Sequence, residues 1–161
     1  MKNIKLLKSQ DITLIQEFIN NNKKDFLYFK NIGWNNITIK NQLNKNNNLS
    51  LGYFDNKVLV GLLFGEIIDL QIHSILEIHV LLVTKKFRRK KIATKILDFF
   101  EKKNKFPQIS MLLIEVAEDN LGAIKFYIKN SFVYYNFRPN YYKYDNKLIN
   151  AKCFKKNINH E

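Results

Sequence analysis

The sequence predicts an α/β fold with about seven strands and about four helices. Short apolar runs, which are typical of strands, alternate with segments whose apolar residues recur at helical spacing. A second observation is the abrupt change within residues 78–97, where an apolar run ends in a basic loop that leads into a helical pattern. The chain has 161 residues and is 46% apolar, so we expect residues 1–161 to form one domain with a packed core.

The N-terminal part is predicted to contain one strand and two helices. Residues 3–7 read as the strand, and Ser9 or Asp11 can cap the first helix, because their side-chain oxygens accept hydrogen bonds from free N–H groups. That helix is expected to end within residues 20–24. Its apolar face is marked by Ile12, Ile15, Phe18 and Ile19.

Aromatic residues gather around a predicted loop before the second helix, which is expected at residues 35–45. The cluster consists of Phe26, Tyr28, Phe29 and Trp34. Such clusters pack into a core more often than they line a ligand site, and both interpretations stay open here.

Three strands are predicted next, at residues 49–54, 58–69 and 74–83, and the turn sequence Asp-Asn-Lys joins the first two. His73 and His79 are isolated histidines without a partner at metal-ligand spacing. We therefore expect them to be ordinary strand residues and expect no metal site.

The C-terminal half is predicted to alternate helix, strand, helix and two strands. The first helix begins at Ile92 and reaches about residue 104, and residues 109–116 read as a strand covered on both faces. Asn120 can cap the next helix. Two closing strands are expected at residues 131–137 and 147–154, joined by a loop at 138–142.

The net charge of +13 invites a nucleic-acid interpretation. However, Lys, Asn and Ile make up about two fifths of the chain, a bias that suggests an AT-rich genome, so much of this charge is discounted. The single cysteine, Cys153, excludes a disulfide within the chain. No apolar segment resembles a signal peptide or a membrane span, and we expect a cytoplasmic protein.

The basic loop at residues 85–91 has six basic residues in seven and lies between a predicted strand and a predicted helix. Such a junction can hold phosphate, because the first helical N–H groups lack partners and the helix dipole favours negative charge. A solvated basic face or a nonspecific nucleic-acid contact is the alternative.

Residues 88–93, Arg-Arg-Lys-Lys-Ile-Ala, resemble the acyl-CoA-binding loop of the GCN5-related N-acetyltransferases (GNAT), whose pattern is Arg/Gln-x-x-Gly-x-Gly/Ala. Lys91 stands where that family has its first glycine. A left-handed backbone there would cost roughly 1–2 kcal/mol, and the sequence leaves open whether Lys91 adopts one. The resemblance implies a mixed, mostly antiparallel sheet that is splayed at the cofactor site.

Residues 114–132 resemble a second GNAT segment, in which an asparagine opens a helix and a tyrosine follows seven residues later. Here these are Asn120 and Tyr127, and Ser131 replaces the usual glycine near the helix end. Together with the Arg-Pro-Asn-Tyr-Tyr tail at 138–142, the resemblance is closest to the ribosomal-protein-alanine N-acetyltransferase (RimI) group.

The resemblance implies roles for particular residues. Glu115 would be the general base, acting through water, and Tyr127 the general acid. Backbone amides of Leu81, Leu82 and Val83 would hold the pantetheine arm and the oxyanion. The remaining cofactor contacts would come from Arg88, Arg89, Lys90, Lys91, Ile92, Ala93, Thr94 and Asn120, and the acceptor contacts from Trp34, Tyr141 and Tyr142.

We therefore expect an enzyme that transfers acetyl from acetyl-CoA to the N-terminal amine of a protein, the N-terminal alanine of a small-subunit ribosomal protein. An α-amine with a pKa of about 8 needs only a modest base, whereas a lysine amine near 10.4 needs a stronger one. One alternative is a GNAT enzyme acting on a small-molecule amine. Another is a noncatalytic RNA-binding module, which is less favoured because the aromatic residues are not interleaved with the basic run. No membrane partner is expected.

Overall fold

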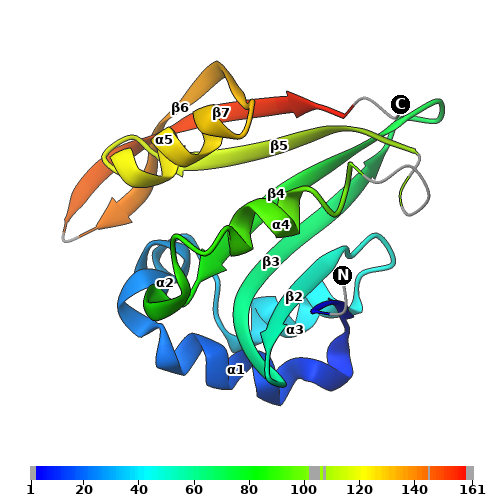
Figure 1. Ribbon diagram of the computed structural model, residues 1–161. Helices are drawn as coiled ribbons and strands as arrows, with labels where there is room; N and C mark the ends of the chain where they lie inside the picture. The colour runs from blue at the N-terminus through cyan, green and yellow to red at the C-terminus, as the bar shows by residue number, and fades with distance from the viewer. Residues whose placement is uncertain (1–2, 102–105, 107, 145, 159–161) are drawn as a thin grey trace.

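The computed structural model describes residues 3–101, 106, 108–144 and 146–158. Within them, a seven-stranded sheet is flanked by five α-helices (Figure 1). The strands are β1 (Ile4–Leu7), β2 (Ser50–Asp55), β3 (Val58–Asp69), β4 (Ser74–Val83), β5 (Ile109–Ala117), β6 (Val133–Tyr144) and β7 (Lys147–Asn157). The helices are α1 (Ile12–Asn21), α2 (Lys23–Asn31), α3 (Asn36–Asn44), α4 (Ile92–Leu97) and α5 (Leu121–Lys129).

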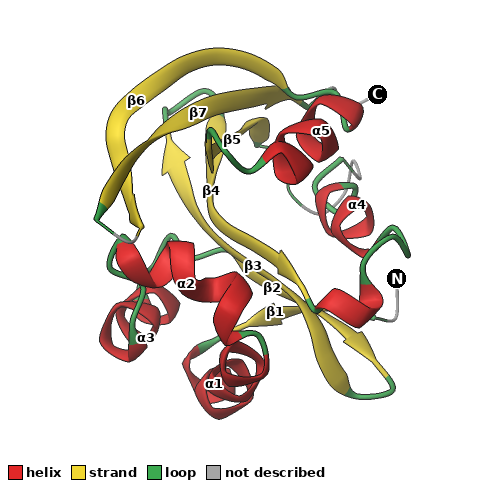
Figure 2. Cartoon of the chain, turned by 90° about the vertical axis from the view of Figure 1, so that its left-hand side faces the viewer, coloured by secondary structure: helices red, strands yellow, loops and turns green. Residues whose placement is uncertain are grey.

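The strand order is β1-β2-β3-β4-β5-β7-β6, and β4 and β5 are parallel while the other neighbours are antiparallel. The predicted mixed, mostly antiparallel sheet is therefore confirmed. Helices α1, α2 and α3 lie on one side of the sheet and α4 and α5 on the other (Figure 2). Each side has its own core: Ile15 and Phe18 belong to the first, and Ile96 and Leu97 to the second.

A bulge in β4 reverses which side chains face which core. Opposite β3, Phe64 pairs with Val80 and Gly65 pairs with Ile78, so His79 is an extra residue without a direct partner across this ladder. Ile78, before the bulge, packs into the core beneath α4 and α5. Val80, after it, packs into the core beneath α1, α2 and α3.

Strands β4 and β5 separate beyond this point. Their parallel register ends at the pair Ile78 and Ile114, although β4 continues to Val83 and β5 to Ala117. Figure 1 shows the two strands diverging from their shared end. The predicted splay is confirmed, and the first residues past the last pair are His79 and Glu115.

The predicted loop containing the first three aromatic residues is wrong. Residues 23–31 form α2, because Phe26 packs into the core and Tyr28 stacks on Tyr144 of β6 with ring centroids 5.4 Å apart. These tertiary contacts outweigh the middling helix propensity of aromatic residues. Asn22 forms the short break after α1, and its side chain donates hydrogen bonds to the Phe18 carbonyl and the Thr84 hydroxyl.

Two further boundaries differ from prediction. Helix α4 ends at Leu97 rather than near residue 104, and residues 102–105 lie outside the described part. The predicted loop at 138–142 is part of β6, which continues to Tyr144 after its register with β7 slips between Arg138 and Tyr142. The slip accommodates Pro139, which has no N–H for a regular ladder, and Asn140, whose φ is +54°.

Candidate active site

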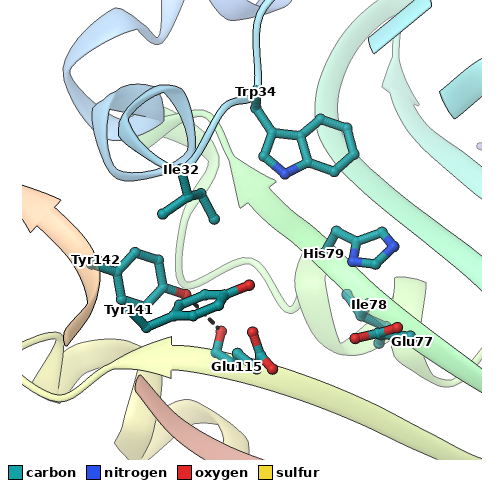
Figure 3. Close-up of a pocket in the computed structure, with 8 residues that line it drawn as sticks. All are labelled: Ile32, Trp34, Glu77, Ile78, His79, Glu115, Tyr141 and Tyr142. Carbon is teal, nitrogen blue, oxygen red and sulfur yellow. Dashed lines mark hydrogen bonds between the residues drawn. The ribbon is translucent and has the colours of Figure 1, made fainter. Parts of the chain in front are cut away.

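A small cavity lies where β4 and β5 separate (Figure 3). Its volume is about 30 Å³, more than the roughly 10–15 Å³ that one water molecule needs. Its polar lining can therefore hold a water. The lining residues are Ile32, Trp34, Glu77, Ile78, His79, Glu115, Tyr141 and Tyr142.

Glu115 reaches this cavity because it is the first residue of β5 beyond the paired part of the splay. Its side chain is 16% exposed, and its Oε1 lies 2.5 Å from Nε of Arg138 on β6. The Tyr142 hydroxyl donates a hydrogen bond of 3.2 Å to the backbone carbonyl of Glu115 (Figure 3). The carboxylate is thus held in place by the guanidinium of Arg138.

Tyr141 and Tyr142 enter the cavity wall from the irregular part of β6. Their rings meet edge to face, with centroids 5.0 Å apart, and the Arg138 guanidinium lies 5.5 Å from the Tyr141 ring. Burial and a hydrogen bond with Glu115 raise the pKa of Tyr141. Burial, followed by the nearby Tyr141, raises the pKa of Tyr142. Both hydroxyls remain protonated donors at neutral pH.

Trp34 forms the opposite wall, in the turn between α2 and α3. Gly33, with φ of +102°, reverses the chain just before it. Asn35 just after it caps α3 by accepting hydrogen bonds from two backbone N–H groups. The indole stacks on Phe64, with centroids 5.0 Å apart and an interplanar angle of 6°, and lies 5.8 Å from the ring of His79.

Tyr127 lies on the other side of the sheet, in the core beneath α4 and α5. It is 5% exposed and contacts Phe132 and Phe154. Burial raises the pKa of Tyr127, so its hydroxyl remains protonated. Among the residues that the structure describes, this buried hydroxyl has no hydrogen-bond partner, and such a group is costly unless a ligand satisfies it.

The basic loop adopts the strained backbone that the sequence left open. Lys91 has φ of +59° and Arg89 has φ of +64°. Arg88 holds the loop in place, since its Nε donates to the Val83 carbonyl at 2.9 Å and its Nη2 lies 2.7 Å from Asp25 of α2. Arg89, Lys90 and Lys91 are exposed, so the cationic side chains face solvent directly before α4.

The structure divides the predicted site residues between the two sides of the splay. Glu115, Trp34, Tyr141 and Tyr142 line one cavity. The other set lies along the α4 and α5 side, where Asn120 caps α5 by accepting a hydrogen bond from the Ala123 N–H at 3.1 Å. The remaining members of that set are Leu81, Val83, Arg88, Arg89, Lys90, Lys91, Ile92, Ala93, Thr94 and Tyr127, whereas the side chain of Leu82 packs into the core beneath α1, α2 and α3.

Sequence reasoning did not assign Glu77 and His79, the two other polar residues of the cavity lining, to the site. His79 lies in β4 as predicted, and the bulge places it in the cavity wall, with its Nε2 3.6 Å from Glu66. His73, which was also predicted to be a strand residue, lies just before β4. The only local signal was that these two polar residues alternate with apolar ones along β4. The described residues contain no group of three or more His, Cys, Asp or Glu side chains that could hold a metal ion, and no helix that could span a membrane.

The chain is similar to the members of a known protein family. The model of the acetyltransferase (GNAT) family matches residues 15–132. No curated protein sequence matches the chain significantly.

Several solved structures share the fold at low sequence identity. The ribosomal-protein-S18-alanine N-acetyltransferase of Escherichia coli superposes with a TM-score of 0.75 at 16% identity, covering 96% of this chain and 92% of its own. Arabidopsis thaliana NAA60 in complex with a bisubstrate analogue gives 0.75 at 16% identity and 98% coverage of both chains. Ard1 of Thermoplasma volcanium gives 0.71 at 19% identity and 97% coverage of both.

Proposed function

Since this chain belongs to the acetyltransferase (GNAT) family, whose members transfer acetyl groups from acetyl-CoA, we propose that its acceptor is the N-terminal α-amine of a protein. The observation that carries this proposal is the position of Glu115 in a cavity walled by Trp34, Tyr141 and Tyr142. A flat indole and two tyrosines flank a narrow space there, which suits an extended peptide end with its amine toward Glu115.

The residues on the α4 side suit acetyl-CoA. Exposed Arg89, Lys90 and Lys91 supply positive charge for its phosphates. The stretch of β4 from residue 79 to 83 no longer pairs with β5, so its backbone is available to the pantetheine arm. The unpartnered hydroxyl of Tyr127 offers a donor inside the protein. Bound acetyl-CoA would supply its activated acetyl group at the point where β4 and β5 separate.

Glu115 and Tyr127 would each handle one proton. The amine attacks the thioester carbonyl as the free base, forming the C–N bond while the C–S bond breaks. Glu115 accepts the proton that the amine loses, through the water for which the cavity has room. Tyr127 donates a proton toward the departing sulfur, and its raised pKa keeps it in the protonated form that this role needs. Backbone amides of Leu81, Leu82 and Val83 are the donors proposed for the developing oxyanion.

The acceptor that we propose is the N-terminal alanine of a small-subunit ribosomal protein. The E. coli structure of the same fold supports this choice, because it is a ribosomal-protein-S18-alanine N-acetyltransferase. The net charge of +13 is also compatible with work close to ribosomal RNA. We propose no metal in the reaction, because a positioned carboxylate and a phenol account for both proton transfers.

The first test combines acetyl-CoA binding by calorimetry with turnover on a short peptide that has a free N-terminal alanine. We expect binding together with turnover. Binding without peptide turnover, but with acetylation of a polyamine or an aminoglycoside, would contradict the proposed acceptor. If acetyl-CoA does not bind and RNA binds with steep salt dependence, the enzyme proposal itself is wrong.

A further inference from the structure

One acidic side chain of the cavity has no part in the mechanism above. Glu77 lies on β4 and lines the same cavity as Glu115 (Figure 3). It is partly buried, and among the residues that the structure describes its carboxylate has no hydrogen-bond or ion-pair partner. Glu115, by contrast, is held by Arg138 at 2.5 Å.

The neighbouring Glu66 shows how the negative charge of a glutamate at this level of the sheet is otherwise stabilised. Glu66 lies directly opposite Glu77 in the register of β3 and β4. Lys45 and Asn47 donate hydrogen bonds to its carboxylate at 2.6 Å and 2.8 Å. Burial acts to raise the pKa of Glu66, but these hydrogen bonds and the charge of Lys45 outweigh it and lower the pKa. Among the described residues Glu77 has no such hydrogen bond or ion pair, and only the weaker, more distant charge of Arg138 acts on it. It is also the one of the pair that lines the cavity.

We propose that Glu77 binds the acceptor amine in its ammonium form. An α-amine with a pKa of about 8 is mostly protonated at pH 7, so the acceptor arrives as a cation. A cation that leaves water for a partly enclosed cavity needs an opposite charge there. Arg138 forms its ion pair with Glu115 and acts on Glu77 more weakly, which leaves Glu77 as the carboxylate that can receive the ammonium group. No covalent step occurs at Glu77. The ammonium group first releases one proton through the cavity water to solvent, and the free amine then attacks and loses its second proton to Glu115, as above.

This inference rests on the proposed function, but it concerns the ammonium group rather than the peptide behind it. The decisive variant is Glu77→Gln, which keeps the size of the side chain and removes its charge. We compare the KM for a peptide with free N-terminal alanine with the inhibition constant of a matched peptide whose terminal amino group is replaced by hydrogen. Exposed Glu17 on α1 provides the control, since Glu17→Gln removes the same charge far from the cavity.

We expect Glu77→Gln to raise the acceptor KM about tenfold, the size typical of a lost charge-assisted hydrogen bond, while kcat changes by less than about twofold. The inhibition constant of the amino-free peptide and the affinity for acetyl-CoA should not change. Glu17→Gln should leave all four quantities as they are. If Glu77→Gln does not fold, Glu77→Asp keeps the charge on a shorter arm and should raise KM about threefold.

Two results would overturn the inference. One is an unchanged KM for the acceptor peptide, whether or not kcat falls. The other is an equal weakening of the binding of the amino-free peptide, which would indicate a distorted groove. A wild-type enzyme that acetylates a polyamine but no peptide contradicts the proposed acceptor alone. In that case a tenfold rise in the polyamine KM still supports the role of Glu77, and an unchanged KM refutes it.

Discussion

The guanidinium of Arg138 reaches across a whole strand to hold Glu115. Arg138 lies on β6 and Glu115 on β5, and β7 runs between them in the sheet. Nevertheless Nε of Arg138 is 2.5 Å from Oε1 of Glu115. The side chain of Arg138 is 53% exposed and that of Glu115 is 16% exposed. The ion pair therefore links a cation at the protein surface to a carboxylate that lines the cavity. It fixes the direction of the carboxylate that we propose as the base.

This ion pair should be measurable as a coupling energy. We expect Arg138→Met and Glu115→Gln each to lower the free energy of unfolding by about 1 kcal/mol, a value reduced for the exposure of Arg138. The double variant should lose no more than either single one, so the coupling is about 1 kcal/mol. Urea unfolding of the four proteins measures it. Additive losses would show that the pair contributes nothing to stability.

Tyr127→Phe should separate catalysis from stability. Because no described residue hydrogen-bonds the buried hydroxyl, its removal should leave the free energy of unfolding unchanged or slightly higher. Loss of the general acid should lower kcat by about a hundredfold or more. Single-turnover kinetics with bound acetyl-CoA tests this. Phe126, the neighbouring aromatic of α5, serves as control through Phe126→Leu, and wild-type turnover by Tyr127→Phe would refute the assigned acid.

The raised pKa of Tyr127 predicts the shape of the alkaline pH profile. A phenol acts as an acid only while it is protonated, and its ordinary pKa is 10.0. Burial raises the pKa of Tyr127, so the protonated form persists to higher pH than in a free tyrosine. The acceptor amine is mostly unprotonated above about pH 9. We therefore expect kcat to stay level from about pH 9 to about pH 10.5, measured with a peptide that lacks lysine and tyrosine. A decline with its midpoint at or below pH 10 would contradict this.

Substitutions of Lys91 separate the effect of backbone strain in the basic loop from the effect of its positive charge. Its φ of +59° costs a lysine roughly 1 kcal/mol relative to glycine, so Lys91→Gly should raise the free energy of unfolding by about that amount. Lys91→Ala removes the charge and keeps the strain, so it should be no more stable than wild type. Both variants should bind acetyl-CoA about threefold more weakly, because both lose one cation. Calorimetry and urea unfolding measure the two effects, and tighter binding by Lys91→Gly would show that strain limits the site.

Local pattern was enough to predict most of the elements and the strand, basic loop and helix that we propose as the cofactor side of the site. The apolar run before Lys85 and the helical spacing after Lys91 are properties of adjacent residues, and so is the cap that Asn120 provides. Helix α2 escaped prediction because contacts with residues far along the chain stabilise it. Tyr28, for example, stacks on Tyr144 and donates a hydrogen bond to Asp119.

The acceptor side was only partly predictable. The family resemblance singled out Glu115, Trp34 and Tyr141, but it carried no distances between them. Neither Glu77 nor His79 was assigned to the site, because the cavity wall beside them depends on a bulge, and a one-residue slip changes which side of a sheet a side chain faces.

By itself the sequence determined the order of the strands and of the helices other than α2, the basic loop and the family to which the chain belongs, because these depend on residues close together in the chain. The tertiary structure alone decided three things: the backbone of Lys91, the reach of Arg138 across β7, and the meeting of Glu77 with Glu115 in one cavity. Each of these depends on how distant segments pack, and packing is settled by the whole chain rather than by local pattern.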